Sequence, residues 1–125
     1  MKNQINISVL VPSYDYLEGV NRILKHYELS EDKDGINIVI SDDSKSNDIK
    51  NLVYENNFFK SGKIQYKKNN PSLGAVKNWN SLIKYSKSEY LFILHQDECP
   101  VSLNFYSELK KVIIDNNKPD LIFLH

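Results

Sequence analysis

The sequence has little cysteine, little arginine and no long apolar run. Cys99 is the only cysteine among 125 residues, which excludes an internal disulfide bond and a multi-cysteine zinc site and suits a reducing compartment. The apolar run over residues 7–11 is shorter than the core of a signal peptide and far short of the roughly 20 residues of a membrane-spanning helix. We therefore expect a soluble cytoplasmic protein without a transmembrane segment, at most peripheral to a membrane.

An excess of charge of either sign is also absent. Sixteen basic residues balance sixteen acidic ones, so the chain lacks the basic footprint of a protein that binds nucleic acid. A content of 41% hydrophobic residues without net charge excludes intrinsic disorder. With 125 residues the chain has the length of one domain, spanning 1–125, and is too short for a TIM barrel of roughly 200 residues or more.

Hydrophobic residues alternate between strand-like and helix-like spacing along the whole chain. The pattern predicts strands near residues 5–11, 36–40, 63–66, 90–94 and 121–124, with a helix in each interval between them. Such alternation predicts an α/β fold of Rossmann-like type, in which a mostly parallel sheet of about five strands lies between two layers of helices.

Several details of packing also follow from the pattern. The runs at 36–40 and 90–94 are continuously apolar, which predicts strands buried on both faces, whereas 63–66 is less apolar and is expected nearer an edge. Ser102 is expected to cap the last helix, and Ser46 or Asn47 an earlier one. Trp79 shares a helical face with Leu82, so we expect it in the core.

Polar residues gather just after the predicted strands. In open α/β sheets, ligands bind outside the carboxyl ends of the strands. The segments at those ends are Val11-Pro12-Ser13-Tyr14-Asp15, then Asp42-Asp43-Ser44-Lys45-Ser46-Asn47-Asp48, then Asn70 through Asn80 with its Leu73-Gly74-Ala75, and Ser88-Glu89-Tyr90-Leu91 leading to His95-Gln96-Asp97.

In these four segments, taken in this order, the chain resembles the N-terminal, nucleotide-sugar-binding portion of inverting family-2 glycosyltransferases with the GT-A fold. The resemblance covers nearly the whole chain. It implies a donor-binding domain that holds a nucleotide-diphosphate sugar, most simply a UDP-sugar, for transfer to a glycan or lipid-linked acceptor in polysaccharide biosynthesis. The chain is then a hexosyltransferase-type domain truncated on its C-terminal side.

The resemblance places the nucleotide base at the first two segments. Backbone groups of Pro12 and Ser13 would lie beside the base, and Tyr14 would form its wall. Asp43, or else Asp42, would accept a hydrogen bond from N3–H of uracil, because an ionised carboxylate only accepts. Tyr14 is equally well explained as a packing residue, and the Asp42–Asp43 pair as a turn with a helix cap.

Asp15 stands where the family usually has asparagine, so it would face the ribose or cap the first helix. In the third segment, Gly74 allows the backbone to approach a ligand closely, and Lys77 or Asn78 would reach the sugar or a phosphate. Asn78 is equally well explained as a solvated helix residue.

A divalent cation, Mn²⁺ or Mg²⁺, would neutralise the diphosphate and stabilise the leaving group. Asp97 matches the last carboxylate of the family's Asp-x-Asp motif, and His95 stands in place of the first. Glu98 would share the ion, although His95 is also well explained as a strand-end histidine without a ligand.

The resemblance assigns no catalytic base, because the family's base lies in the C-terminal half; Glu98 is the only carboxylate near the loop that would substitute. Two alternatives therefore stay open: a non-catalytic binding module that has kept the fold, and a nucleotidyltransferase, which usually has a glycine-rich basic loop that residues 12–16 lack. An edge strand left uncovered also predicts association into a homodimer.

Overall fold

The computed structural model describes residues 5–86 and 88–118. Within them four strands form one parallel sheet in the order β3-β2-β1-β4. The strands are β1 (Ile7–Ser13), β2 (Ile36–Asp42), β3 (Ile64–Lys68) and β4 (Tyr90–Ile93), and the helices are α1 (Leu17–Leu29), α2 (Asp48–Tyr54), α3 (Asn57–Lys60), α4 (Ala75–Tyr85) and α5 (Phe105–Asp115). The fifth strand predicted over 121–124 lies outside the described residues.

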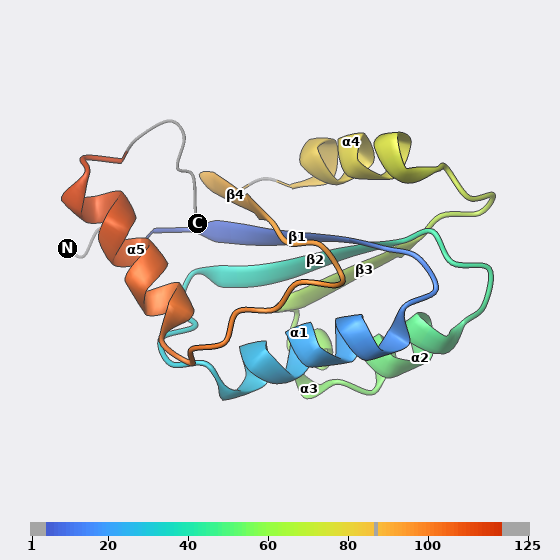
Figure 1. Ribbon diagram of the computed structural model, residues 1–125, viewed down its shortest axis with the longest axis horizontal. Coiled ribbons are helices and arrows are strands. Elements are labelled where there is room, and N and C mark those ends of the chain that lie inside the picture. The colour runs from blue at the N-terminus through green and yellow to red at the C-terminus, as the bar shows by residue number, and fades with distance from the viewer. Residues whose placement is uncertain (1–4, 87, 119–125) are drawn as a thin grey trace.

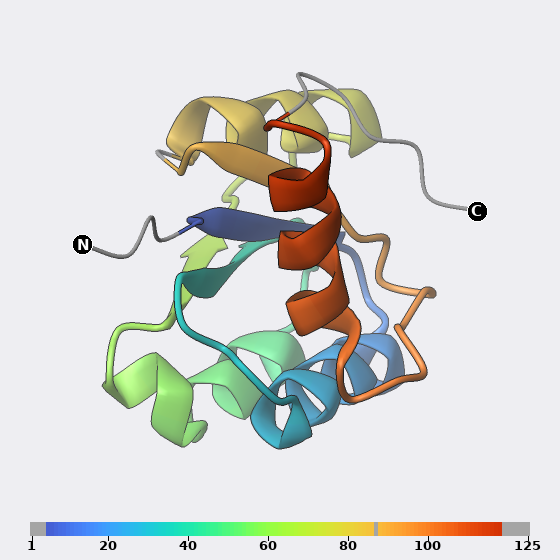
Figure 2. The same cartoon turned by 90° about the vertical axis from the view of Figure 1, so that its left-hand side faces the viewer.

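The sheet is the middle of three layers, as the alternating pattern predicted. Helix α4 lies on one face, and α1, α2 and α3 lie on the other (Figures 1 and 2). The larger core packs on the α1 side and includes Tyr27 from α1, Tyr106 from α5 and alternate residues of β1 and β2. The α4 side holds a small cluster of Leu10, Val39 and Leu82. The apolar energy of the fold therefore comes mainly from the α1 side.

Strand burial confirms one prediction and corrects another. β3 is an edge strand, as its lower apolarity predicted, and every residue of β1 is buried. β4 was predicted to be buried on both faces, but Leu91 and Ile93 are 40% and 37% exposed. They pair with Ser8 and Leu10 and so share the α4 face, where α4 contacts β1 and β2. Among the helices that the structure describes, none therefore covers the α4 face of β4.

The helix caps also differ from the predictions. α5 begins at Phe105, so its N-cap is Asn104, and the Ser102 hydroxyl bonds the Asn104 side chain instead of a helix amide. α2 starts after Asn47, as predicted, but that side chain makes no capping bond; the Ser46 hydroxyl accepts from the Asp48 amide at 3.4 Å. None of the described helices is both long enough and apolar enough to span a bilayer.

Candidate functional site

The loops after the four strands meet around one hollow of about 630 Å³ at the carboxyl ends of the sheet, which we call the strand-end hollow. Most residues that the sequence predicted for a nucleotide or metal site line it, namely Pro12, Ser13, Tyr14, Asp43, Gly74, Asn78, His95 and Asp97. The parallel order of the sheet explains the convergence, because every strand delivers its following loop to the same edge.

Asp43 is the carboxylate of the pair that lines the hollow. It follows β2 directly and is only 5% exposed. Its Oδ1 accepts from the Leu73 amide at 2.7 Å and the Asn69 side chain at 3.1 Å, and its Oδ2 accepts from the Gly74 amide at 2.9 Å. Two carboxylate oxygens offer about four acceptor positions, so these three bonds leave Oδ2 one position for a ligand.

The pKa of Asp43 reflects the same contacts. Burial by itself would raise it, but the bonds from the Leu73 and Gly74 amides, the bond from Asn69 and the charge of Lys68 together hold the pKa of Asp43 below its usual value. Asp43 therefore stays ionised as an acceptor at neutral pH, and it ties the loop before α4 to the end of β2.

Asp42 and Asp15 do not line the strand-end hollow. Asp42 is fully buried as the last residue of β2, where its carboxylate accepts from the Tyr66 hydroxyl at 2.5 Å and the Ser44 amide at 3.0 Å. Asp15 has a φ of 50°, and its amide donates to the Ser44 hydroxyl at 2.7 Å. It does not occupy the N-cap of α1, which is Tyr16. Asp42 is thus placed to hold the loop, and Asp43 to face a ligand.

Asn78 is 3% exposed and is not the solvated residue that one interpretation of the sequence expected. Its amide nitrogen donates to the Ser41 carbonyl at 3.1 Å, and its oxygen accepts from Asn69 at 3.0 Å. Asn69 in turn donates to Asp43. This buried polar chain fixes the first turns of α4 against β2, where the apolar cluster beneath the helix is small.

Replacing Asn78 with alanine is expected to lower the free energy of unfolding by about 1–3 kcal/mol, because it removes two buried hydrogen bonds, one to the Ser41 carbonyl and one from Asn69. Urea denaturation measures the change. Asn80→Ala is the matched control, since Asn80 lies exposed on the same helix. Equal loss of stability in the two variants would contradict the structural role given to Asn78.

Aromatic side chains form part of the wall. Tyr14 is 51% exposed beside the hollow, so its ring is available to a flat ligand. Trp79 also lines the hollow, half-buried, with its ring centroid 4.5 Å from that of His95. The prediction that Trp79 belongs to the core is wrong, because its ring packs against His95 in the loop after β4, whereas Leu82 packs on Leu10 and Val39 of the sheet.

Other lining residues were not predicted from the sequence. They include Lys45, which brings a positive charge, and Ser72, whose hydroxyl donates to the Asp43 carbonyl at 2.7 Å. Gln96 is a third, and its side chain bonds the backbone of Tyr14. The lysine directly after the Asp-Asp-Ser run was the one available signal. A long-range bond to a backbone group leaves no signal in sequence spacing.

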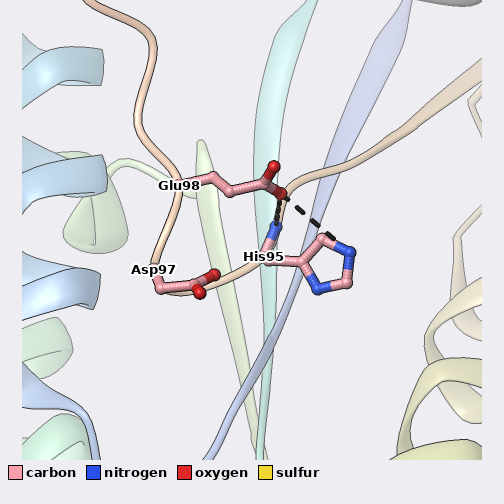
Figure 3. Close-up of side chains that lie close together, drawn as sticks. All are labelled: His95, Asp97 and Glu98. Carbon is pink, nitrogen blue, oxygen red and sulfur yellow. Dashed lines mark hydrogen bonds and ion pairs between the residues drawn. The ribbon is translucent and has the colours of Figure 1, made fainter.

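His95 and Asp97 line the hollow, and Glu98 lies close to both of them (Figure 3); we call these three residues the rim cluster. One ligand atom from each lies within 4.8 Å of the others, and all three residues are exposed. The Glu98 carboxylate lies 4.0 Å from Nε2 of His95 and accepts from the His95 amide at 3.2 Å. Two carboxylates and an imidazole suit Mn²⁺ well, and Mg²⁺ less well because of the nitrogen donor. The donor set therefore fits a divalent cation.

Comparison with known families and structures agrees with this geometry. The family model for glycosyl transferase family 2 matches residues 8–118. Among curated proteins, no relative matches the sequence.

Solved structures show the same fold. The Staphylococcus aureus protein TarS (residues 1–349) in complex with UDP-GlcNAc has a TM-score of 0.75 at 16% identity, over 90% of this chain and 32% of that one. The complex of the same protein with UDP has a TM-score of 0.76 at 16% identity, over 90% of this chain and 33% of that one. The mannosyltransferase PcManGT from Pyrobaculum calidifontis, in complex with GDP-Man and Mn²⁺, gives 0.74 at 13% identity, over 89% and 33%. The chain spans about a third of the length of these proteins.

Proposed function

The chain belongs to glycosyl transferase family 2, and from that premise we propose that its strand-end hollow holds the sugar donor, a UDP-sugar, for transfer of the sugar to an acceptor. The observation that carries the proposal is the convergence of four loops on one hollow that exposes Tyr14 and presents an ionised Asp43. The solved relatives in complex with UDP, UDP-GlcNAc and GDP-Man support a nucleotide ligand of this class.

The base fits between an aromatic wall and one acceptor. The ring of Tyr14 offers a flat surface of the kind on which a uracil stacks, and the remaining acceptor position on Oδ2 of Asp43 would take its N3–H. Because Asp43 is already ordered by three bonds, it would accept this fourth bond without further loss of side-chain entropy.

The diphosphate would lie toward Lys45 and the rim. His95, Asp97 and Glu98 would hold a divalent cation there, as their donor set allows. Bound metal supplies charge neutralisation of the diphosphate and stabilisation of the departing nucleoside diphosphate. The carboxylates of Asp97 and Glu98 would hold the cation in place. Lys45, which lines the same hollow, would add a second positive charge near the diphosphate.

Transfer with inversion requires an acceptor hydroxyl to attack the anomeric carbon while the bond from that carbon to the diphosphate oxygen breaks. A base then takes the hydroxyl proton. The chain spans about a third of its structural relatives, so the base, the glycan or lipid-linked acceptor, cytoplasmic location and pairing of two copies through a sheet edge stay predictions. Donor binding is the part of the reaction that the described residues support.

Calorimetric titration of the chain with UDP, a UDP-sugar, GDP and ADP in the presence of Mn²⁺ tests the proposal. We expect saturable binding of UDP and the UDP-sugar at one site, with GDP and ADP, which have the same charge as UDP but other bases, binding more weakly. Equal binding of all the nucleoside diphosphates would mean that the hollow recognises the diphosphate and not the base. Absence of binding by any nucleotide would refute the proposal.

One observation favours a second candidate, a module that binds the donor without transferring it. His95 stands where the resemblance places an acidic residue of the metal motif. Hydrolysis of a UDP-sugar by the chain, abolished by Asp97→Ala, would exclude this candidate. Binding of the donor with no hydrolysis or transfer to any acceptor would favour it.

A further inference from the structure

The side chain of Gln96 joins two parts of the strand-end hollow that come from distant segments. The Tyr14 amide donates to Oε1 of Gln96 at 2.8 Å, and Nε2 of Gln96 donates to the Tyr14 carbonyl at 3.2 Å, across 82 residues of sequence. The pair of bonds satisfies both polar groups of the Tyr14 backbone with one planar amide. The position of Tyr14 is thus set by the loop after β4.

Gln96 stands inside the loop that carries the metal-ligating residues. Its neighbours His95 and Asp97, together with Glu98, form the rim cluster. The loop is closed by the Glu98 amide, which donates to the His95 carbonyl at 2.9 Å, and by the bond from the His95 amide to the Glu98 carboxylate. Any cation that orders this cluster therefore orders the backbone on either side of Gln96.

Helix α1 packs closely against the same loop at Gly19. A Cβ built on Gly19 would lie 2.0 Å from the Gln96 carbonyl oxygen, so the close approach of α1 to this loop depends on glycine at position 19. The segment that carries Tyr14 leads directly into α1. The metal-ligating loop, the wall of the base site and the start of α1 are thus in mutual contact through Gln96.

We propose that Gln96 is a positioning residue that couples the metal site to the base site, so that occupation of either strengthens binding at the other. The inference rests on the proposed function. Ordering the loop by a cation would place the Gln96 amide, and through it the Tyr14 backbone, in the geometry that a base requires. The conformational entropy of the loop is then lost only once, when the first ligand binds, so the second ligand binds more tightly. By reciprocity, the cation strengthens base binding by the same factor as the base strengthens cation binding.

Uridine separates this coupling from direct contact, since it carries the base but no phosphate that could touch the cation. We expect Mn²⁺ to strengthen uridine binding to the wild-type chain by about fivefold, at the low end of usual coupling. Gln96→Met keeps the length of the side chain and removes both bonds to Tyr14. The ratio of uridine affinity with Mn²⁺ to uridine affinity without Mn²⁺ is therefore expected to fall to about one. Gln65→Met is the matched control, because Gln65 is exposed on β3 and does not line the hollow.

A second measurement covers weak uridine binding or an unfolded variant. Exchange of the Tyr14 amide hydrogen, observed by NMR in the wild-type chain, is expected to slow several-fold when Mg²⁺ is added. Free Mn²⁺ measured by electron paramagnetic resonance reports the affinity of the metal site itself, which Gln96→Met should leave within about threefold if the residue only positions Tyr14.

The outcomes separate the coupling from the proposed function. If UDP binds but Mn²⁺ leaves uridine affinity unchanged and Mg²⁺ leaves Tyr14 exchange unchanged, the coupling is refuted and donor binding stands. The same conclusion follows if Gln96→Met retains the wild-type ratio. If neither uridine nor UDP binds, the proposed function fails and the coupling fails with it.

Discussion

Replacing Asp43 with asparagine is expected to lower the free energy of unfolding by about 2–3 kcal/mol and to weaken UDP binding about 30- to 100-fold. The loss of stability follows from the amides of Leu73 and Gly74, which donate to the two oxygens of this buried carboxylate. An asparagine keeps one oxygen and turns an NH₂ group toward one of these donors. It also removes the negative charge that favours the N-terminus of α4.

The loss of binding has a separate cause. Oδ2 of Asp43 accepts one bond from the protein and has one further acceptor position. An asparagine keeps most bonds when its oxygen takes the place of Oδ1, where it accepts from the Leu73 amide and from Asn69. Its NH₂ group then takes the place of Oδ2 and presents a donor to uracil N3–H, so two donors would oppose each other. Calorimetry with UDP measures this effect at a temperature where the variant is folded.

Asp34→Asn is the control for Asp43→Asn. Asp34 is exposed in the turn before β2, at the opposite end of that strand, so the same loss of charge should change stability by less than about 0.5 kcal/mol and leave UDP binding unchanged. Normal UDP affinity in a folded Asp43→Asn variant would contradict the role of Asp43 as the acceptor for the base.

In acid, the difference in the free energy of unfolding between the wild-type chain and Asp43→Asn should become smaller. The pKa of Asp43 is held below its usual value in the fold, whereas the unfolded chain has a carboxyl near about 3.9. The carboxylate thus contributes its full stability above the unfolded pKa, and loses it as pH falls through the folded pKa. Urea midpoints of the two proteins should converge between neutral pH and strong acid. A constant difference would contradict the assignment.

Replacing Asp97 with alanine is expected to weaken Mn²⁺ binding by more than the roughly 10–100-fold typical of a lost outer-shell partner. Asp97 belongs to the cluster of three residues proposed to hold the cation, and its loss leaves the imidazole of His95 and the Glu98 carboxylate. UDP affinity measured with Mn²⁺ should fall to the value measured without metal. Because Asp97 is exposed, stability should change little.

Two further results define what Asp97→Ala tests. Uridine binding without metal should be unchanged, because the contacts proposed for the base are at Tyr14 and Asp43. Asp34→Ala again serves as the control, since it removes an exposed aspartate away from the hollow. Wild-type dependence of UDP binding on Mn²⁺ in Asp97→Ala would contradict a metal site at this rim.

The order of elements and the place of the site could be predicted from the sequence, because each follows from local pattern. Alternating periodicity identified the strands, and parallel strands bring their following loops to one edge. The family resemblance then singled out polar residues, most of which line the strand-end hollow. Neither step needed knowledge of how far any helix extends across the sheet.

The errors concern features that depend on such distances. Trp79 shares a helical face with Leu82, yet its ring packs against His95 and lines the hollow instead of joining the apolar cluster that holds Leu82. Leu91 is apolar, yet it is 40% exposed because α4 does not extend over β4. By contrast, Asp43, which the resemblance favoured over Asp42, does line the hollow, whereas Asp42 is the buried last residue of β2. Gln96 required the three-dimensional structure, since its partner is 82 residues away.

Amide chemical shifts during titration with UDP test the central claim, that the strand-end hollow is the donor site, most directly. The account predicts saturable shifts of the amides of Tyr14, Asp43 and Gly74, which border the hollow, with one dissociation constant. The amides of Gly35 and Gly62 border a separate hollow that none of these residues lines and should not move. Shifts confined to Gly35 and Gly62, or no saturable shifts at the strand-end hollow, would contradict it.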